Sequence, residues 1–311
     1  MSIPRELEWQ VFRGSTAVSR GLLTGNQLRG RALVRVRHDV YADARLAFDH
    51  ALACRATLAR LPAGAAVIAG PSAAFLHGVG HAAAPTDQVR AILLPPHRVG
   101  TQQGLRIHRV RLDAVDIAVA GDLRLTTPER TAWDTAVWLS MPSAVAVVDA
   151  LLAGGLVTPD SLERVAARLA DRPGGKVAAR AFALADGASP APAESAVRVR
   201  LVLSGLPRPQ VRPATIMRLG KVLHPGLVWP EQRVAVDYEG PLYRERRDLL
   251  EADGWRVVPA GRRSTTLARE VRDALIARGW QPGWLPRPAA HQVNGSRRRV
   301  AGRLGGGGAS G

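Results

Sequence analysis

The sequence has 311 residues, of which 46% are hydrophobic, and it carries a formal net charge of +17 at pH 7. This length is sufficient for two domains, and this apolar content supports packed cores and argues against a disordered chain. A single cysteine, Cys54, excludes an intramolecular disulfide and a cysteine-cluster zinc site. No apolar stretch reaches the roughly 20 residues that span a bilayer, and the first ten residues do not resemble a signal peptide. We therefore expect a cytoplasmic protein that makes no contact with a membrane.

The positive charge indicates a polyanionic partner, and nucleic acid is the most common one. Only Lys176 and Lys221 among the 43 basic residues are lysines, so arginine supplies almost all of the positive charge. Because a GC-rich genome also favours arginine codons, a merely basic, solvated surface is the alternative interpretation.

Residues 1–45 predict a winged-helix-like segment. The pattern "LEWQVFRG" predicts a short amphipathic helix, and "LLTGNQLRGR" predicts a second one with Thr24 as its N-cap. The stretch "ALVRVRHDVYAD" alternates apolar and basic residues and predicts a hairpin that breaks at His38 and Asp39. Four arginines would then face a phosphate backbone, or alternatively line the exposed face of a small sheet. These residues are Arg29, Arg31, Arg35 and Arg37.

Residues 46–188 predict an α+β and helical connector. Helices are expected over residues 46–61 and 70–80, the second capped by Ser72, and strands over "DQVRAILLPP", "GLRIHRVRL" and "LRLT". Thr127 and Pro128 predict the start of a helix whose two tryptophans, Trp133 and Trp138, belong to the core. Further helices follow to residue 186, and the small residues and prolines of "GASPAP", residues 187–192, predict a linker.

Residues 189–288 predict a second domain, and residues 289–311 a disordered basic and glycine-rich tail. A helix over residues 193–206 precedes two strands joined at Leu219 and Gly220, with Pro213 at an edge or a strand end. A third strand "RVAVDYEG", a helix over residues 242–254, a fourth strand "WRVVPA" and a closing helix capped by Thr265 or Thr266 complete the unit.

Side chains alternate between the faces of a strand, so Asp237 and Glu239 share one face of "RVAVDYEG". Two carboxylates in this arrangement can lean toward a divalent cation, which binds oxygen ligands and can activate water at a phosphodiester. The alternative is that both acids lie on a solvated face or form ion pairs with Arg244 or Arg247.

The segments "SPAPAESAVRVRLVLSGLPRPQV", "LVWPEQRVAVDYEG" and "DLLEADGWRVV" make residues 189–258 similar to the restriction-endonuclease-like domain of the family related to very-short-patch-repair endonucleases, common in actinobacterial hypothetical proteins. The resemblance implies a mixed sheet flanked by helices and an Mg²⁺ site in which Glu194, Asp237 and Glu239 are both the metal ligands and the catalytic residues.

Gly226 stands where that family usually has an aspartate, and neither it nor the nearby His224 supplies an oxygen ligand. Glu194 also lies where an acid in the first turn of a helix is favourable in any protein. The sequence therefore leaves open a degenerate domain that kept the fold and an active Mg-dependent endonuclease. Three further arginines close to the acids are expected to contact nucleic acid. They are Arg244, Arg246 and Arg247.

The segments "RGLLTGNQLRGRALVRVRHDVYAD", "SAAFLHGVG" and "LRLTTPERTAWDTA" make residues 12–140 similar to the N-terminal part of AbiEi-like antitoxins of type IV toxin–antitoxin systems. This resemblance implies a winged-helix DNA reader followed by an α+β connector, and a toxin or other protein as a further partner.

The sequence thus predicts a fold of α/β and α+β parts and a nucleic-acid-binding protein with a degenerate metal-dependent endonuclease domain. An active Mg-dependent DNA endonuclease and an antitoxin-like transcriptional regulator without enzymatic activity are the alternatives.

Overall fold

The structure is a computed structural model, and it describes residues 3–189, 191–216, 220, 222–238, 240, 242–261 and 266–283. The chain divides into two units, Met1–Trp280 and Gln281–Gly311, and the elements below belong to the first. The expected tail over residues 289–311 and the predicted cap residue Thr265 lie outside the described residues.

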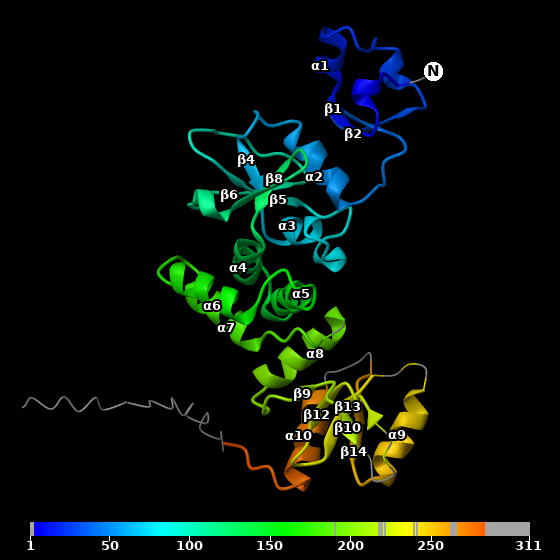
Figure 1. The fold of residues 1–311 in the computed structure, drawn as a ribbon, viewed down its shortest axis with the longest axis vertical. Helices are drawn as coiled ribbons and strands as arrows, with labels where there is room; N and C mark the ends of the chain where they lie inside the picture. Colours follow the sequence, from blue (N-terminus) through cyan, green and yellow to red (C-terminus); the bar gives the residue numbers. More distant parts are fainter. Residues whose placement is uncertain are drawn as a thin grey trace, which may run out of the picture. The chain divides into compact units, whose positions relative to one another are not determined.

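The N-terminal part forms a three-stranded antiparallel sheet in the order β1-β3-β2 (Figure 1). The predicted helix over "LEWQVFRG" is wrong: only the 3-10 helix Arg5–Leu7 forms, Trp9 adopts a positive φ of 56°, and Val11–Arg13 is strand β1. The reason is tertiary, since β1 pairs with β3, which lies about 30 residues further along the chain. The elements are β1 Val11–Arg13, α1 Gly14–Ser19, β2 Leu33–Arg37 and β3 Val40–Asp43.

The second short helix and the hairpin are confirmed, but the N-cap of this helix is Asn26 and not Thr24 as predicted. The 3-10 helix Gln27–Arg29 follows Thr24, whose hydroxyl accepts from the Gln27 backbone N–H, while the Gln27 side chain accepts from the Thr24 N–H. The hairpin turns at His38 and Asp39, as expected, with Asp39 at φ 59°. Its carboxylate accepts from the backbone and the hydroxyl of Ser15, which ties the turn to α1.

A five-stranded mixed sheet forms the centre of the connector, in the order β6-β5-β4-β8-β7. The three predicted strands are confirmed. Two further strands were not predicted, because β4 is a three-residue apolar run whose burial hides any alternation, and β7 mixes small and apolar residues. The strands are β4 Ala66–Ile68, β5 Val89–Leu93, β6 Leu105–His108, β7 Ile117–Ala120 and β8 Leu123–Thr126.

Two helices, α2 His50–Leu58 and α3 Gly70–Leu76, pack near this sheet. Cys54 belongs to their shared core with the sheet, and burial raises the pKa of its thiol to about 12, as expected for an inert cysteine. The prediction that Ser72 caps α3 is wrong. The helix already begins at Gly70, and the Ser72 hydroxyl instead bonds to the His50 ring and accepts from the Arg90 backbone N–H.

A group of five helices follows the sheet. Thr127 caps the first of them and Pro128 opens it, as predicted. Trp133 is buried in the helical core, whereas Trp138 is only partly buried and stacks on the His108 ring with the ring centroids 3.5 Å apart. The helices are α4 Pro128–Trp138, α5 Met141–Ala153, α6 Pro159–Arg168, α7 Gly175–Leu184 and α8 Pro192–Leu203.

Helix α8 shares a core with α4 and α5 through Val199, which packs with Trp133 and Val145. Arg198 of α8, which is fully buried, also forms an ion pair of 2.6 Å with Asp149 of α5. The predicted linker over residues 187–192 therefore lies between helices that are packed against common neighbours.

The C-terminal part has a four-stranded mixed sheet in the order β14-β13-β12-β9, in which only β13 and β14 are parallel. Instead of two long strands, the described residues between 209 and 229 form four short ones, and Pro213 lies between the first two, where it removes no sheet hydrogen bond. Leu219 lies outside the described residues. The strands are β9 Gln210–Val211, β10 Thr215–Ile216, β11 Val222–Leu223, β12 Leu227–Trp229, β13 Val234–Asp237 and β14 Arg256–Pro259.

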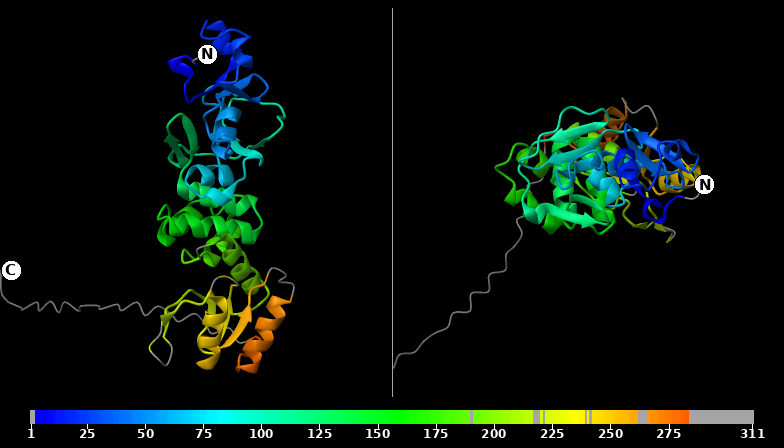
Figure 2. Two further views of the ribbon diagram at one scale, coloured as in Figure 1. Left: turned by 90° about the vertical axis from the view of Figure 1, so that its right-hand side faces the viewer. Right: turned by 90° about the horizontal axis from the view of Figure 1, so that it is seen from above.

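Two helices cover opposite faces of this sheet (Figure 2). Helix α10, Leu267–Ala277, packs on the face that carries Val234 and Val236, and α9, Tyr243–Ala252, packs through Leu250 on the face that carries Val257. Both helices and the third and fourth strands are confirmed, as is the fold class of mixed α+β and α/β parts. Among the described residues, no helix has the length and apolarity needed to cross a bilayer.

Candidate nucleic-acid interface and acidic site

Three of the four N-terminal arginines form an available basic surface. Arg29 ends the 3-10 helix, Arg31 precedes β2 and Arg35 lies on it, and all three are exposed. None of their guanidinium groups makes a hydrogen bond or an ion pair with a described residue. Guanidinium groups in this state keep all their donors for an external anion, and phosphate is one of the two anions, with carboxylate, whose geometry they match.

Arg37 is positioned differently. The pairing of β2 with β3 shifts register between Arg35 and Arg37, and the Arg37 guanidinium is partly buried and donates to the carbonyl oxygens of Gln103 at 2.7 Å and Gly104 at 3.4 Å. A Cβ at Gly104 would lie 2.7 Å from Nη1 of Arg37, so glycine is what admits the guanidinium there. Arg37 is thus engaged within the protein.

The acid expected on the central strand, Asp237, is the last residue of β13 and is buried. Its Oδ2 accepts from Nε of Arg246 at 2.9 Å, and its Oδ1 accepts a longer bond of 3.4 Å from the Gly226 backbone N–H. Arg246 comes from α9, on the sheet face that Asp237 shares with Ala235. A cation therefore already occupies one side of this carboxylate.

The acid expected on the helix, Glu194, lies in the first turn of α8 and is also buried. Arg212 donates to it through Nε at 3.2 Å and Nη2 at 2.7 Å, the two-pronged geometry of a strong arginine–carboxylate pair. This bond raises the pKa of Arg212, and the charge of Asp237 acts in the same direction. Glu194 and Asp237 therefore share one electrostatic environment, but each has its own arginine.

Gly226 lies beside the ring of Tyr238. A Cβ at position 226 would be 2.6 Å from Cε2 of that ring and 3.1 Å from the Val236 carbonyl oxygen. Burial raises the pKa of the Tyr238 hydroxyl, which donates to the Glu194 carbonyl oxygen at 3.4 Å. The volume that a side chain at position 226 would need is filled by an aromatic ring.

The remaining predicted residues have varied environments. Glu239 lies outside the described residues. Arg244 is exposed, and Arg247 pairs with Glu251 of the same helix at 2.9 Å, so the arginine that neutralises Asp237 is Arg246 rather than either residue considered from the sequence. In the described part of the chain, no group of three or more His, Cys, Asp or Glu side chains is arranged to hold a metal ion.

Arg212 and Tyr238 have the largest effect on this site among the residues that sequence reasoning missed. Arg212 is 18 positions from Glu194, and no periodic pattern links the two. Its positive φ of 42°, in the segment that leaves β9, turns the chain at this point, and this is visible only in three dimensions. Tyr238 was assigned to a strand face, with no indication that its ring would occupy the space beside Gly226.

A second charged cluster lies in the connector. Arg130, only 2% exposed, donates to Asp116 and Asp134, each at 2.9 Å, and Arg168 reaches Asp116 at 2.5 Å. Burial raises the pKa of Asp134 to about 7. Arg130, Asp116 and Asp134 are buried, so this cluster ties α4 and α6 to the chain before β7, with Arg168 at its exposed edge.

Fold and site together define a basic α+β protein with a small arginine-bearing N-terminal sheet and a C-terminal α/β part whose acids are paired with arginines. Residues 65–186, from the start of β4 to just beyond α7, match the family model of the AbiEi antitoxin C-terminal domain. This match confirms the antitoxin resemblance in part. The matched range overlaps the predicted range of 12–140 only from residue 65 onward and continues to residue 186. It also concerns the C-terminal domain of those antitoxins and not their N-terminal part.

The chain is also similar to uncharacterized proteins of two Mycobacterium tuberculosis strains, CDC 1551 / Oshkosh and ATCC 25618 / H37Rv. Each is 29% identical over 272 residues, which cover 81% of this chain and 97% of the relative. The similarity therefore extends well beyond the 122 residues that match the antitoxin domain.

Proposed function

We propose that this protein is a cytoplasmic, antitoxin-like regulator that binds DNA through its N-terminal part. The observation that carries the proposal is the set of three exposed arginines on the N-terminal sheet and its preceding 3-10 helix, which have no partner among the described residues. The match of the following 122 residues to an antitoxin domain supports a regulatory role.

The arginines suit contacts with the DNA backbone. Arg35 lies on β2, Arg31 lies two residues before the start of that strand, and Arg29 ends the preceding helical turn. Contacts of arginine with phosphate position a protein on a duplex and account for most of its non-specific affinity. Which bases are read, if any, would depend on other side chains.

We further propose that the C-terminal part is a restriction-endonuclease-like domain that has lost its metal chemistry. The pairs Arg212–Glu194 and Arg246–Asp237 support this interpretation, because a guanidinium satisfies a carboxylate without activating water. The ring of Tyr238 beside Gly226 supports it as well, since a third oxygen ligand has no space there. In this proposal the two arginines take the place of the metal cation and neutralise the buried carboxylates of Glu194 and Asp237.

The test of DNA binding is a salt titration of affinity for a 30-base-pair duplex, measured by fluorescence anisotropy with the full chain. We expect log K to fall linearly with log salt. The variant Arg29→Gln/Arg31→Gln/Arg35→Gln should reduce the slope by about one for each phosphate that is no longer neutralised. The matched control is Arg164→Gln/Arg180→Gln/Arg200→Gln, which removes the same charge from exposed, unpaired positions on α6, α7 and α8.

Equal slopes for the two triple variants would refute the N-terminal interface. The nuclease alternative is tested with the same proteins by incubating plasmid with Mg²⁺ or Mn²⁺. We expect no cleavage above that of Asp237→Ala. Cleavage by the wild type that disappears in Asp237→Ala would replace the degenerate domain with an active Mg-dependent endonuclease, with Glu194, Asp237 and Glu239 as ligands.

A toxin or another protein is the second partner that the antitoxin match suggests. We propose that residues 65–186 of the connector carry that contact, because they are the part similar to the antitoxin domain. Co-expression with the neighbouring open reading frame, followed by affinity purification of the full chain, tests this assignment. Recovery of the neighbour with a variant that lacks the connector would contradict it.

A further inference from the structure

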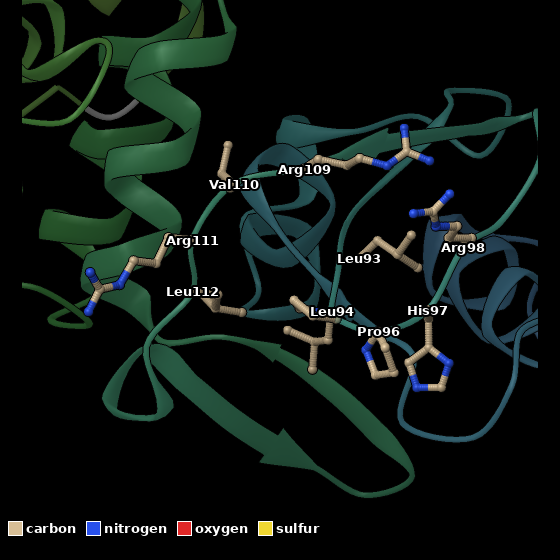
Figure 3. Close-up of a pocket in the computed structure, with 10 residues that line it drawn as sticks. Leu93, Leu94, Pro96, His97, Arg98, Arg109, Val110, Arg111 and Leu112 are labelled. Carbon is tan, nitrogen blue, oxygen red and sulfur yellow. The ribbon is translucent and has the colours of Figure 1, made fainter.

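A cleft of about 810 Å³ lies at the carboxyl ends of β5 and β6, which run parallel to each other (Figure 3). Its walls are the segments that immediately follow the two strands, residues 93–98 and 109–112. The carboxyl ends of parallel strands are the usual location of ligand sites in open sheets, because diverging loops leave a crevice there. Its volume falls within the range of roughly 300–1,000 Å³ that is typical of small-molecule sites.

The floor of the cleft is apolar and anchored. Leu93 ends β5 and is buried in the core that β4, β5, β6 and α2 share, so this side of the cleft is fixed by packing. Leu94, Leu112 and Val110 continue the apolar surface, together with two adjacent prolines. A planar or apolar part of a ligand could pack against this floor without leaving a buried polar group unpaired.

The polar groups of the cleft are cationic or neutral, and none of its lining residues is acidic. Arg98 and Arg109 belong to the two facing segments and make no hydrogen bond or ion pair with a described residue. Their guanidinium groups lie on one side of the cleft, whereas Arg111 extends away from it and donates to Asp113 at 3.1 Å (Figure 3). These two exposed guanidiniums keep their donors available to an anion that enters above the apolar floor.

We propose that this cleft binds a free nucleotide, with its phosphate between Arg98 and Arg109 and its base on the apolar floor. Guanidinium forks form paired hydrogen bonds with phosphate oxygens, which a halide cannot do, and a phosphate monoester carries nearly two negative charges, which balances two guanidiniums where a carboxylate balances one. The floor favours a ligand that also presents a flat ring, which excludes inorganic phosphate as the preferred occupant. The site is separate from the N-terminal arginines, so this proposal does not depend on DNA binding.

The test is calorimetric titration of the full chain with adenosine 5′-monophosphate, adenosine, inorganic phosphate and a five-nucleotide single strand. We expect the monophosphate to bind, adenosine and phosphate alone to bind at least about tenfold more weakly, and Arg98→Gln/Arg109→Gln to lose at least about tenfold in affinity. Arg164→Gln/Arg180→Gln, which removes the same charge elsewhere, should bind the monophosphate as the wild type does.

A second variant, Val110→Asp, keeps both arginines and places a repelling charge in the cleft at a side chain that is already exposed. It should weaken monophosphate binding as strongly as the arginine variant while leaving the circular dichroism spectrum unchanged. The N-terminal triple variant should retain full affinity for the nucleotide, which separates this site from the DNA interface.

Three results would overturn the proposal: no binding of the monophosphate at millimolar concentration, equal binding by wild type and Arg98→Gln/Arg109→Gln, or equal affinity for inorganic phosphate and the nucleotide. Binding of the oligonucleotide alone through the two arginines would also overturn it, because the occupant would then be a nucleic-acid strand instead of a free nucleotide.

Discussion

At position 226 the main chain passes so close to the ring of Tyr238 that only glycine fits without a shift of neighbouring atoms. The same ring donates through its hydroxyl to the first turn of α8, where Glu194 is paired with Arg212. Individual residues therefore fill and neutralise the surroundings of the two acids in two ways: an aromatic ring occupies the space beside Gly226, and guanidiniums pair with the carboxylates.

The residue-scale prediction is that Gly226→Asp destabilises the C-terminal part by about 1–3 kcal/mol, the usual effect of overpacking. Urea denaturation followed by tryptophan fluorescence measures this change, since Trp229 belongs to the affected core. Gly240→Asp is the matched control, because a Cβ at Gly240 meets no atom within 4 Å. Adding Tyr238→Ala to Gly226→Asp should cost less than the sum of the two single changes, and strict additivity would show that the ring is not the obstacle.

At the scale of elements, α8 connects the helical group with the C-terminal sheet. Val199 packs among residues of α4, α5 and α7, while Leu201 belongs to the core of β12, β13 and α10. Arg198 between them donates to the Leu184 carbonyl oxygen at the end of α7 and to Asp149 of α5. A single helix thus contributes to two cores, and its buried ion pair fixes it against the first.

The element-scale prediction is that Arg198→Met costs about 3–5 kcal/mol at pH 7, because it leaves the Asp149 carboxylate buried without its cation. Burial raises the pKa of Asp149 above that in the unfolded chain, so the folded state retains a proton that the unfolded state releases. The contribution of the protonated Asp149 carboxyl to folding stability is therefore lost as the pH rises from its pKa in the unfolded chain to its raised pKa in the folded protein. The destabilisation by Arg198→Met should accordingly be smaller near pH 4. Urea denaturation between pH 4 and pH 8 checks this dependence.

Two comparisons make this measurement specific. Asp149→Asn/Arg198→Met should recover part of the stability at pH 7 and remove the additional pH dependence. Arg200→Met changes an exposed arginine of the same helix and should have little effect. If Arg198→Met is equally destabilising at every pH, poorer packing and not the uncompensated carboxylate accounts for its effect.

At the scale of the whole molecule, the excess of positive charge opposes compactness, since like charges on a folded surface repel one another. The ion pairs with the least exposure, such as Arg130–Asp116, are hardly screened by salt, while the unpaired exposed arginines are strongly screened. Added salt should therefore relieve repulsion more than it weakens the ion pairs that hold the fold.

The whole-molecule prediction is that the thermal midpoint rises when NaCl increases from about 0.02 to 0.3 M, a range over which the Debye length falls severalfold. Scanning calorimetry or circular dichroism measures the midpoint. The variant Arg164→Gln/Arg180→Gln/Arg200→Gln carries three fewer positive charges and should show a smaller rise. A midpoint that falls with salt would mean that surface ion pairs outweigh the net repulsion.

The sequence by itself determined the elements whose signals are local. The hairpin turn at His38 and Asp39, the start of α4 at Thr127 and Pro128, and the alternation of β13 each depend on hydrogen bonds or side-chain periods within a few residues. In these three places the local signals agree with the tertiary contacts, and for this reason they were confirmed. The strand Val11–Arg13 was missed because its partner lies far along the chain.

Only the tertiary structure decided how the acids are paired. Arg212 and Glu194 are 18 positions apart and Arg246 and Asp237 nine, and which cation meets which carboxylate follows from the order of strands and the side on which α8 and α9 pack. The ring beside Gly226 and the cleft between the segments after β5 and β6 arise in the same way. Contacts across elements depend on where those elements are placed, and no local pattern in the chain encodes that placement.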